Sequence, residues 1–272
     1  MFHLEHMRIS YTVLMAAEDT FPALSVVIPA FNEEARIKKT LRSVSEYIEE
    51  LPYASEVLVI DDGSSDKTSE VVLSERATMP YLKLLRFKRN LGKGWAVREG
   101  MLNSIGRYRL FMDADGSTDV AHWRDMKTAL DKGADVAVGS RHAPGSLIRV
   151  RQAPHREMLG QVFRYLVRGI FQMPINDTQN GFKAFRAEAA ARIFGRQKVS
   201  GWAFDVEVLS IAKALKYEIV EVPITWVDDD RSRMTFSAMP RMLSDLMRIR
   251  MNAIQQRPTY SMHETPQLVR LA

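Results

Sequence analysis

Two aspartates one residue apart, Asp113 and Asp115, directly follow an apolar run at residues 110–112. Gly116 comes next, and its conformational freedom would let the chain turn so that both carboxylates reach one ion. Carboxylate oxygens without His or Cys ligands favour Mg²⁺ or Mn²⁺, which often share their coordination shell with substrate phosphates. Acid-rich turns are also common without a metal, so this motif alone leaves both interpretations open.

Polar side chains follow two other apolar runs in the same way. Asn32 and Glu33 come shortly after the first run of the chain, and Asp61 and Asp62 come directly after the second. In open α/β sheets, ligands bind beyond the carboxyl ends of the strands. Several acidic strand ends at one edge of one sheet therefore indicate a binding site, whereas a single one is usually a turn.

The elements that must position these residues alternate between strands and helices. Continuous apolar runs predict buried strands, and apolar residues three or four apart predict amphipathic helices. The predicted strands cover residues 24–28, 56–60, 82–87, 108–112 and 134–139, and the helices cover 34–50, 67–77, 93–104 and 121–131. This alternation predicts an α/β fold with a mainly parallel sheet flanked by helices.

The pattern changes after residue 150. We predict helices over 155–172, 204–216 and about 240–255. Residues 176–185 are predicted to be a loop entering a short strand, and 218–227 an extended segment. We expect this half to complete a single domain over 23–255 by covering one face of the sheet. Residues 1–22 are interpreted as an N-terminal extension and residues 256–272 as a C-terminal tail.

The composition limits the classes of function. The 272 residues include no cysteine, which excludes disulfides and Cys-ligated metals. A net charge of +5 suits nucleic acid, anionic lipid or a phosphorylated substrate. No apolar run approaches the roughly 20 residues of a membrane span. The Gly-rich signatures of P-loop and dinucleotide-binding proteins are both missing.

The segment "RNLGKGWAV" at residues 89–97 places Lys93 near a predicted helix start. Its ammonium and the nearby backbone N–H groups suit contact with a diphosphate. A helix-leading turn with solvated basic side chains would explain the same residues equally well.

Several motifs together resemble a known family. "SVVIPAFNEE", "VLVIDDGSSDKT", "NLGKGWAVREGM", "FMDADGSTD" and "VGSR" occur in the order and spacing of family 2 glycosyltransferases, over roughly residues 23–250. "DTQNGFKAFRAEAA" and "GWAFDVEVL" resemble one branch, the dolichyl-phosphate β-glucosyltransferases and related polyprenyl-phosphate glycosyltransferases. The resemblance implies a GT-A fold with a Rossmann-like sheet, and an inverting transfer of sugar from a nucleotide donor to a lipid phosphate.

The resemblance also implies roles for individual residues. The expected nucleotide-sugar pocket comprises Pro29, Ala30, Phe31, Asn32, Glu33, Asp61, Asp62, Lys93, Asp113, Ala114 and Asp115. Asp113 and Asp115 are expected to bind Mg²⁺ or Mn²⁺, with Asp115 the direct ligand. The residues expected to be catalytic are Asp115, Arg141 and Asp205.

The acceptor implied by the resemblance is a phosphate, which is largely anionic at neutral pH and hardly needs a general base. Asp205 is therefore expected to position the sugar or the acceptor. Arg141 is expected to face the phosphates, and Arg156, Arg231 and Arg233 suit the acceptor phosphate. Solvated surface positions stay open for the last three arginines.

The identity of the donor depends on one departure from the pattern. Related mannosyltransferases carry Gln where this chain has Ser117, which favours UDP-glucose over GDP-mannose. Three alternatives remain: a GDP-mannose-dependent polyprenyl-phosphate mannosyltransferase, a sugar nucleotidyltransferase and a non-catalytic nucleotide-sugar-binding protein. The nucleotidyltransferase usually needs a Gly-rich loop that "IPAFNEE" does not supply, and the intact Asp113, Asp115 and Arg141 disfavour a non-catalytic protein.

A polyprenyl phosphate acceptor implies contact with a membrane surface. We expect peripheral attachment at the cytoplasmic face of a membrane, mainly through the basic, amphipathic helix at about 240–255. The apolar stripe of the helix at 155–172 is expected mostly to pack inside the protein. No nucleic-acid partner is expected, and association into a homo-oligomer stays open.

Overall fold

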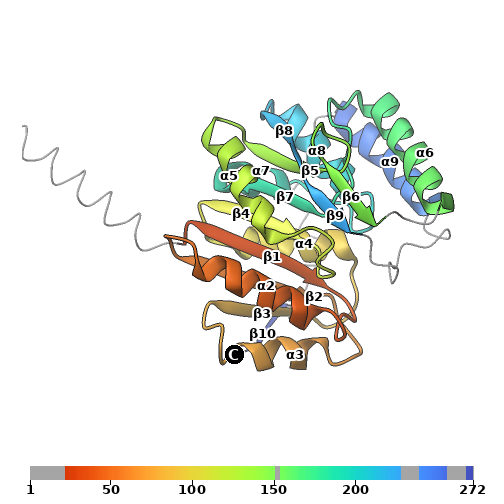
Figure 1. Cartoon of the computed structure of the whole chain (residues 1–272). Helices are drawn as coiled ribbons and strands as arrows, with labels where there is room; N and C mark the ends of the chain where they lie inside the picture. The colour runs from red at the N-terminus through yellow and green to blue at the C-terminus, as the bar shows by residue number, and fades with distance from the viewer. Residues whose placement is uncertain (1–21, 151–153, 228–238, 256–267, 272) are drawn as a thin grey trace, which may run out of the picture.

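The structure, a computed structural model, describes residues 22–150, 154–227, 239–255 and 268–271 (Figure 1). An eight-stranded sheet has the order β10-β3-β2-β1-β4-β7-β5-β8. Its strands are β1 (Leu24–Ala30), β2 (Ser55–Asp61), β3 (Leu82–Phe87), β4 (Tyr108–Met112), β5 (Val136–Ser140), β7 (Phe182–Arg186), β8 (Ile219–Pro223) and β10 (Leu268–Leu271). A second sheet pairs β6 (Leu147–Val150) with β9 (Thr225–Val227).

The large sheet is mainly parallel, as the sequence predicts. The pairs β1–β2, β2–β3, β1–β4 and β5–β8 are parallel. Strand β7 is antiparallel to both of its neighbours, β4 and β5, and β10 is antiparallel to β3. Strand β7 therefore brings the segment that precedes it to the carboxyl end of β4, which matters for the site.

Helices cover both faces of the sheet. They are α2 (Ile37–Glu49), α3 (Thr68–Glu75), α4 (Lys93–Asn103), α5 (Trp123–Asp131) with the preceding 3₁₀ turn η1 (Val120–His122), α6 (Pro154–Phe171), α7 (Ala187–Phe194), α8 (Phe204–Ala214) and α9 (Met239–Gln255). One core lies between the sheet and α4, α7 and α8, and the other lies under α2, α3 and α5.

Strand β1 is apolar at most of its positions, and its burial on both faces explains why. Val27 packs into the first core, whereas Val26 and Ile28 pack into the second. Successive side chains of a strand point to opposite faces, so a strand with both faces covered is apolar on both. The polar Ser25 is also buried, and its hydroxyl donates to Oε1 of Glu56 at 2.5 Å. The same reasoning explains the run in β4, where Leu110 and Phe111 belong to different cores.

Helices α6 and α9 extend beyond the sheet and lie side by side at one end of the molecule (Figure 1). Met242, Leu246 and Ile249 of α9 are buried, as are Phe163 and Val167 of α6. The expectation that the apolar stripe of 155–172 mostly packs inside holds only for part of it, because other apolar residues of α6 face solvent. None of the described helices has both the length and the hydropathy that a membrane span requires.

Three elements were not predicted: α7, β6 and β10. Strand β10 lies in the segment interpreted as a tail and extends the sheet at the β3 edge. Four residues carry little local signal, and their strand conformation depends on the edge that they pair with. Residues 1–21 of the expected extension and 256–267 of the expected tail lie outside the described residues.

Candidate functional site

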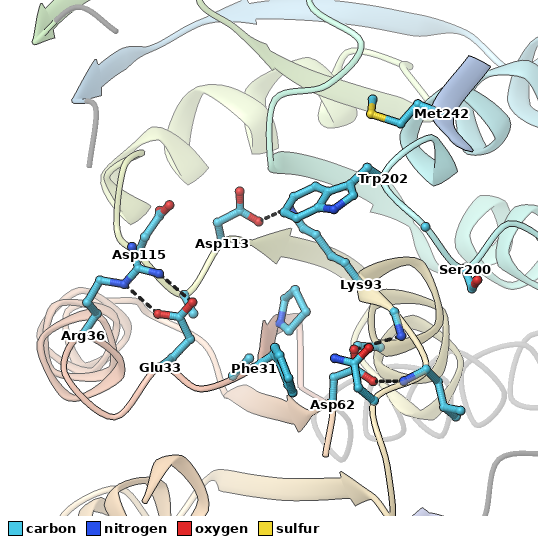
Figure 2. A pocket seen from close by; sticks show the side chains of 18 of the residues that line it. Phe31, Glu33, Arg36, Asp62, Lys93, Asp113, Asp115, Ser200, Trp202 and Met242 are labelled. Carbon is cyan, nitrogen blue, oxygen red and sulfur yellow. Dashed lines mark hydrogen bonds and ion pairs between the residues drawn. The ribbon is translucent and has the colours of Figure 1, made fainter. Parts of the chain in front are cut away.

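A cavity of about 700 Å³ opens at the carboxyl ends of β1, β2 and β4 (Figure 2). That volume is in the range that holds a small-molecule or cofactor ligand. The cavity is lined by Pro29, Ala30, Phe31, Glu33, Arg36, Asp62, Asn90, Leu91, Gly92, Lys93, Ala96, Asp113, Ala114, Asp115, Ser200, Gly201, Trp202, Met242 and Asp245. The structure thus brings together the polar ends of three strands that are far apart in the sequence.

Asp113 and Asp115 lie in the turn that follows β4. The Asp113 backbone N–H donates to the Gly181 carbonyl at 3.1 Å, and the Ser117 N–H donates to Oδ1 of Asp115 at 2.9 Å. Gly116 has φ 69°, the left-handed conformation that glycine adopts without strain. Burial raises the pKa of Asp115, and the charge of Asp113 raises it further.

These two carboxylates fit a divalent cation. A buried carboxylate beside a second one is unfavourable as an anion, and a cation between them relieves both the burial and the repulsion. Within the described residues no group of three or more His, Asp or Glu side chains is arranged as a metal site. Asp113 and Asp115 would therefore hold an ion such as Mg²⁺ jointly with water and substrate oxygens, as is usual for that ion.

Lys93 supplies positive charge to the same end of the cavity. It is the first residue of α4, and its Nζ lies 2.6 Å from Oδ1 of Asp113 and 5.3 Å from the centre of the Trp202 ring (Figure 2). Burial alone would lower the pKa of Lys93, but the charges of Asp113, Asp205 and Asp115 raise it overall. Lys93 is therefore a cation held between the acidic turn and an aromatic side chain.

Asp62 shapes the opposite end of the cavity. Its two carboxylate oxygens accept hydrogen bonds from the backbone N–H groups of Leu91 and Gly92, at 2.7 and 3.0 Å. Burial raises the pKa of Asp62 to about 6. Asp61, in contrast, lies beneath the lining, is fully buried and accepts hydrogen bonds from the Ser64 N–H at 2.7 Å and the Ser69 hydroxyl. Asp61 thus supports the loop that carries Asp62.

The segment after β1 forms the remaining wall. Glu33 makes two hydrogen bonds of 2.6 Å to the guanidinium of Arg36, and both residues line the cavity. Asn32 has φ 53°, and its Oδ1 accepts from the Ser65 N–H at 2.8 Å, so this side chain ties the segment to the loop after β2. Pro29, Ala30 and Phe31 line the cavity as the resemblance implies.

The structure places Arg141 outside this lining. Its guanidinium makes two hydrogen bonds to Asp177, Nε to Oδ2 at 2.7 Å and Nη2 to Oδ1 at 2.8 Å, and lies 5.1 Å from the centre of the Trp226 ring. Burial would raise the pKa of Asp177, but the charge and hydrogen bonds of Arg141 lower it to about 2. In the described structure Arg141, whose side chain is 22% exposed, therefore forms an ion pair with the buried Asp177.

Asp205 also lies behind the lining. Its carboxylate accepts from Lys183 Nζ at 2.6 Å, and both side chains are almost completely buried. Two of the expected catalytic residues, Arg141 and Asp205, are thus engaged with protein partners, and Asp115 faces the cavity. The side chains of Arg156, Arg231 and Arg233 lie outside the described part of the structure.

Sequence reasoning missed part of the cavity wall. Arg36, the turn at residues 90–92, the segment at residues 200–202, Met242 and Asp245 line it without having been assigned there. The motif "GWAF", which is part of the resemblance, contains Trp202. Met242 and Asp245 carried no local signal, because only the packing of α9 brings them to the cavity.

Comparisons with known proteins agree with this geometry. The model of the family described as glycosyl transferase family 2 matches residues 25–194. The chain is 36% identical over 240 residues to a dolichyl-phosphate beta-glucosyltransferase of Dictyostelium discoideum, covering 84% of this chain and 73% of that protein. It is 34% identical to the human protein of the same name, covering 84% and 75%.

Solved structures have the same fold. Glucosyl-3-phosphoglycerate synthase from Mycobacterium tuberculosis, in complex with Mn²⁺, UDP-glucose and phosphoglyceric acid, superposes with a TM-score of 0.64 at 16% identity. The superposition covers 89% of this chain and 83% of that one. The expected GT-A fold is therefore confirmed. Together, the family match and the extent of the similarity to the relatives identify this chain as a member of glycosyl transferase family 2.

Proposed function

We propose that this protein transfers glucose from UDP-glucose to a dolichyl or related polyprenyl phosphate, with inversion to a β-linked product and with Mg²⁺ or Mn²⁺. The observation that carries the proposal is that one cavity is lined both by the paired acids Asp113 and Asp115 and by Asp62, Phe31 and Glu33. Its volume of about 700 Å³ is in the range that holds a small-molecule ligand such as a nucleotide sugar. We take glucose as the transferred sugar and dolichyl phosphate as the acceptor from the names of the relatives.

In the proposed reaction, residues of this chain bind the donor and stabilise negative charge. A divalent ion held by Asp113 and Asp115 would stabilise the negative charge that develops on the leaving diphosphate. Lys93 places a further positive charge beside that end of the cavity, 2.6 Å from Asp113. Trp202 provides an apolar wall there, which limits the access of water to the sugar.

The acceptor needs little help from a base. A phosphate oxygen attacks the anomeric carbon, the bond from that carbon to the diphosphate breaks, and UDP leaves with the electron pair. A phosphate monoester has its second pKa near 6 and is mostly dianionic at neutral pH. The engagement of Asp205 with Lys183 is consistent with a mechanism that uses no carboxylate base.

A donor competition tests the proposed reaction. UDP-glucose should give a higher kcat/KM than GDP-mannose with a polyprenyl phosphate acceptor, and EDTA should abolish transfer until Mg²⁺ or Mn²⁺ is added. Asp115→Ala should lower kcat by about 10²–10³, as for the loss of one charge-stabilising group. A preference for GDP-mannose would favour the mannosyltransferase alternative, and full turnover in EDTA would contradict the metal site.

We also propose that the protein binds the membrane that holds its acceptor. Helices α6 and α9 expose an apolar patch, formed by Met158, Val162, Tyr165, Leu166, Leu243, Met247 and Met251. Tyr165 and Met247 are 66% and 62% exposed. Arg248 and Arg250 of α9 are exposed next to the patch, and basic side chains near apolar ones suit an anionic bilayer surface.

The patch gives α6 a larger share of the surface that the sequence assigns mainly to α9. Because Met242 and Asp245 of the same α9 line the cavity, a bilayer against the patch would lie close to the site of transfer. We place this membrane contact at the cytoplasmic face, a compartment that the lack of cysteine fits. Protease protection of the protein in sealed vesicles would test that side.

Liposome flotation tests the membrane contact. The wild type should float with anionic vesicles at low salt, and a variant with Arg248→Glu and Arg250→Glu should stay in the dense fraction. The matched control is Arg124→Glu with Lys132→Glu, the same charge change at exposed positions on or next to α5, away from the patch. Equal flotation of all three proteins would contradict this surface.

A further inference from the structure

Lys183 is a charged side chain in the protein interior that has no role in the proposed reaction. It lies in the middle of β7, between β4 and β5, and is fully buried. Phe182 and Ala184 face one core of the protein, so Lys183 points to the other side, toward α8. Burying an ammonium group is costly unless it is paired and hydrogen-bonded.

The ammonium of Lys183 joins two parts of the chain. Its Nζ donates to the Asn180 carbonyl at 2.5 Å and to Oδ1 of Asp205 at 2.6 Å, and it lies 5.3 Å from the centre of the Phe111 ring. Asn180 belongs to the turn before β7, and Asp205 belongs to the first turn of α8. The lysine therefore fixes the turn at residues 180–181 to a helix.

The turn at residues 180–181 contacts Asp113. The Gly181 carbonyl accepts from the Asp113 N–H at 3.1 Å. A Cβ added at Gly181 would lie 2.1 Å from Oδ2 and 2.3 Å from Cγ of Asp113, closer than real Cβ atoms approach. Residue 181 must therefore be glycine for the Asp113 carboxylate to occupy its observed place.

We propose that Lys183 is a positioning residue for the metal site, acting through the turn Asn180–Gly181 on Asp113. The inference rests on the proposed function only in calling Asp113 a metal ligand. Asp205 supplies the counter-ion that makes a buried lysine possible at this position. A buried ion pair contributes little to stability in general but can hold one arrangement of the chain.

A simpler explanation is that Lys183 only neutralises Asp205. A double-mutant cycle separates the two, because Asp205→Asn removes the charge while its amide oxygen can still accept from the lysine. If Lys183 only neutralises Asp205, then adding Lys183→Met to the Asp205→Asn variant should leave the hydrogen bond of the Asp113 amide unchanged. If Lys183 positions the turn, the double variant loses the hydrogen bond to the Asn180 carbonyl, and the turn at residues 180–181 becomes more mobile.

Hydrogen exchange of the Asp113 amide is the primary measurement, made without metal, donor or acceptor. We expect exchange to be about tenfold faster in Lys183→Met/Asp205→Asn than in Asp205→Asn, because the hydrogen bond to Gly181 opens more often. Val72→Ala, a change in α3 in the other core, controls for destabilisation away from β7 and should not speed exchange at Asp113. Equal exchange in the two Asp205→Asn proteins would overturn the proposal.

Mn²⁺ binding in the presence of UDP is the second measurement. We expect the double variant to bind Mn²⁺ about 10–100-fold more weakly than Asp205→Asn, the usual effect of losing a group that orients a metal ligand. Gly181→Ala should weaken Mn²⁺ binding at least as much, and wild-type affinity in that variant would overturn the link from the turn to Asp113. If the wild type neither transfers sugar nor binds Mn²⁺, the proposed function fails, while the exchange measurement still decides whether Lys183 positions Asp113.

Discussion

The ion pair between Arg141 and Asp177 should make the stability of this protein depend on pH in a defined way. The Asp177 side chain is 3% exposed and takes up two hydrogen bonds from the Arg141 guanidinium. Arg141 outweighs the effect of burial and lowers the pKa of Asp177 from 3.8 to about 2. In the unfolded chain this partner is absent, so the carboxyl returns to its ordinary pKa.

The size of the effect follows from the shift. Because the folded pKa lies below the unfolded one, the stabilisation is complete at pH well above 3.8 and is lost as pH falls through 2. A pKa lowered from 3.8 to about 2 corresponds to about 2 kcal/mol of stabilisation at pH 7, about 1 kcal/mol at pH 3 and well under about 1 kcal/mol at pH 2.

Urea denaturation of the wild type and of Asp177→Asn, from pH 7 down to pH 3, measures this term. The difference in the free energy of unfolding should shrink by about 1 kcal/mol over that range. A difference that stays constant, or grows as the pH falls, would refute the assignment of this charge pair. Arg141→Ala should cost about 3–5 kcal/mol at pH 7, because it leaves a buried carboxylate without its counter-ion. That cost would lower Tm by about 6–20 °C. The loss of stability toward low pH should then disappear or reverse, because burial raises the pKa of Asp177 once the guanidinium is gone.

Two further predictions concern the cavity and the core. Burial raises the pKa of Asp62 to about 6, so its effect on stability runs the other way with pH. As pH falls from 7 to 5 this group should raise the free energy of unfolding by about 1 kcal/mol, and the rise should be missing in urea titrations of Asp62→Asn. Gly100→Ala should destabilise the protein by about 1–2 kcal/mol, because the overpacking cost exceeds the gain in helix propensity; its Cβ would lie 2.2 Å from Cγ1 of Val27, and an increase in Tm would contradict the packing of α4 on β1.

Much of the fold could be predicted because its signals are local. Strands buried on both faces need unbroken apolar runs, and helices that cover them need an apolar stripe, so the order of β1 to β5 and α2 to α5 follows from the sequence. The positions of Asp113, Asp115 and Asp62 at strand ends follow as well, because parallel strands place their carboxyl ends at one edge. Local patterns do not reveal an antiparallel insertion such as β7, whose place between β4 and β5 depends on long-range pairing.

The sequence by itself determined which groups are available for chemistry, and the tertiary structure decided which of them meet. Arg141 was expected at the phosphates, yet it pairs with Asp177, 36 residues away; Asp205 was expected at the substrate, yet it pairs with Lys183. Met242 and Asp245 reach the cavity only because α9 packs there. A buried charge must find an opposite charge within hydrogen-bond distance, and the segment that supplies it is set by the packing of the whole chain.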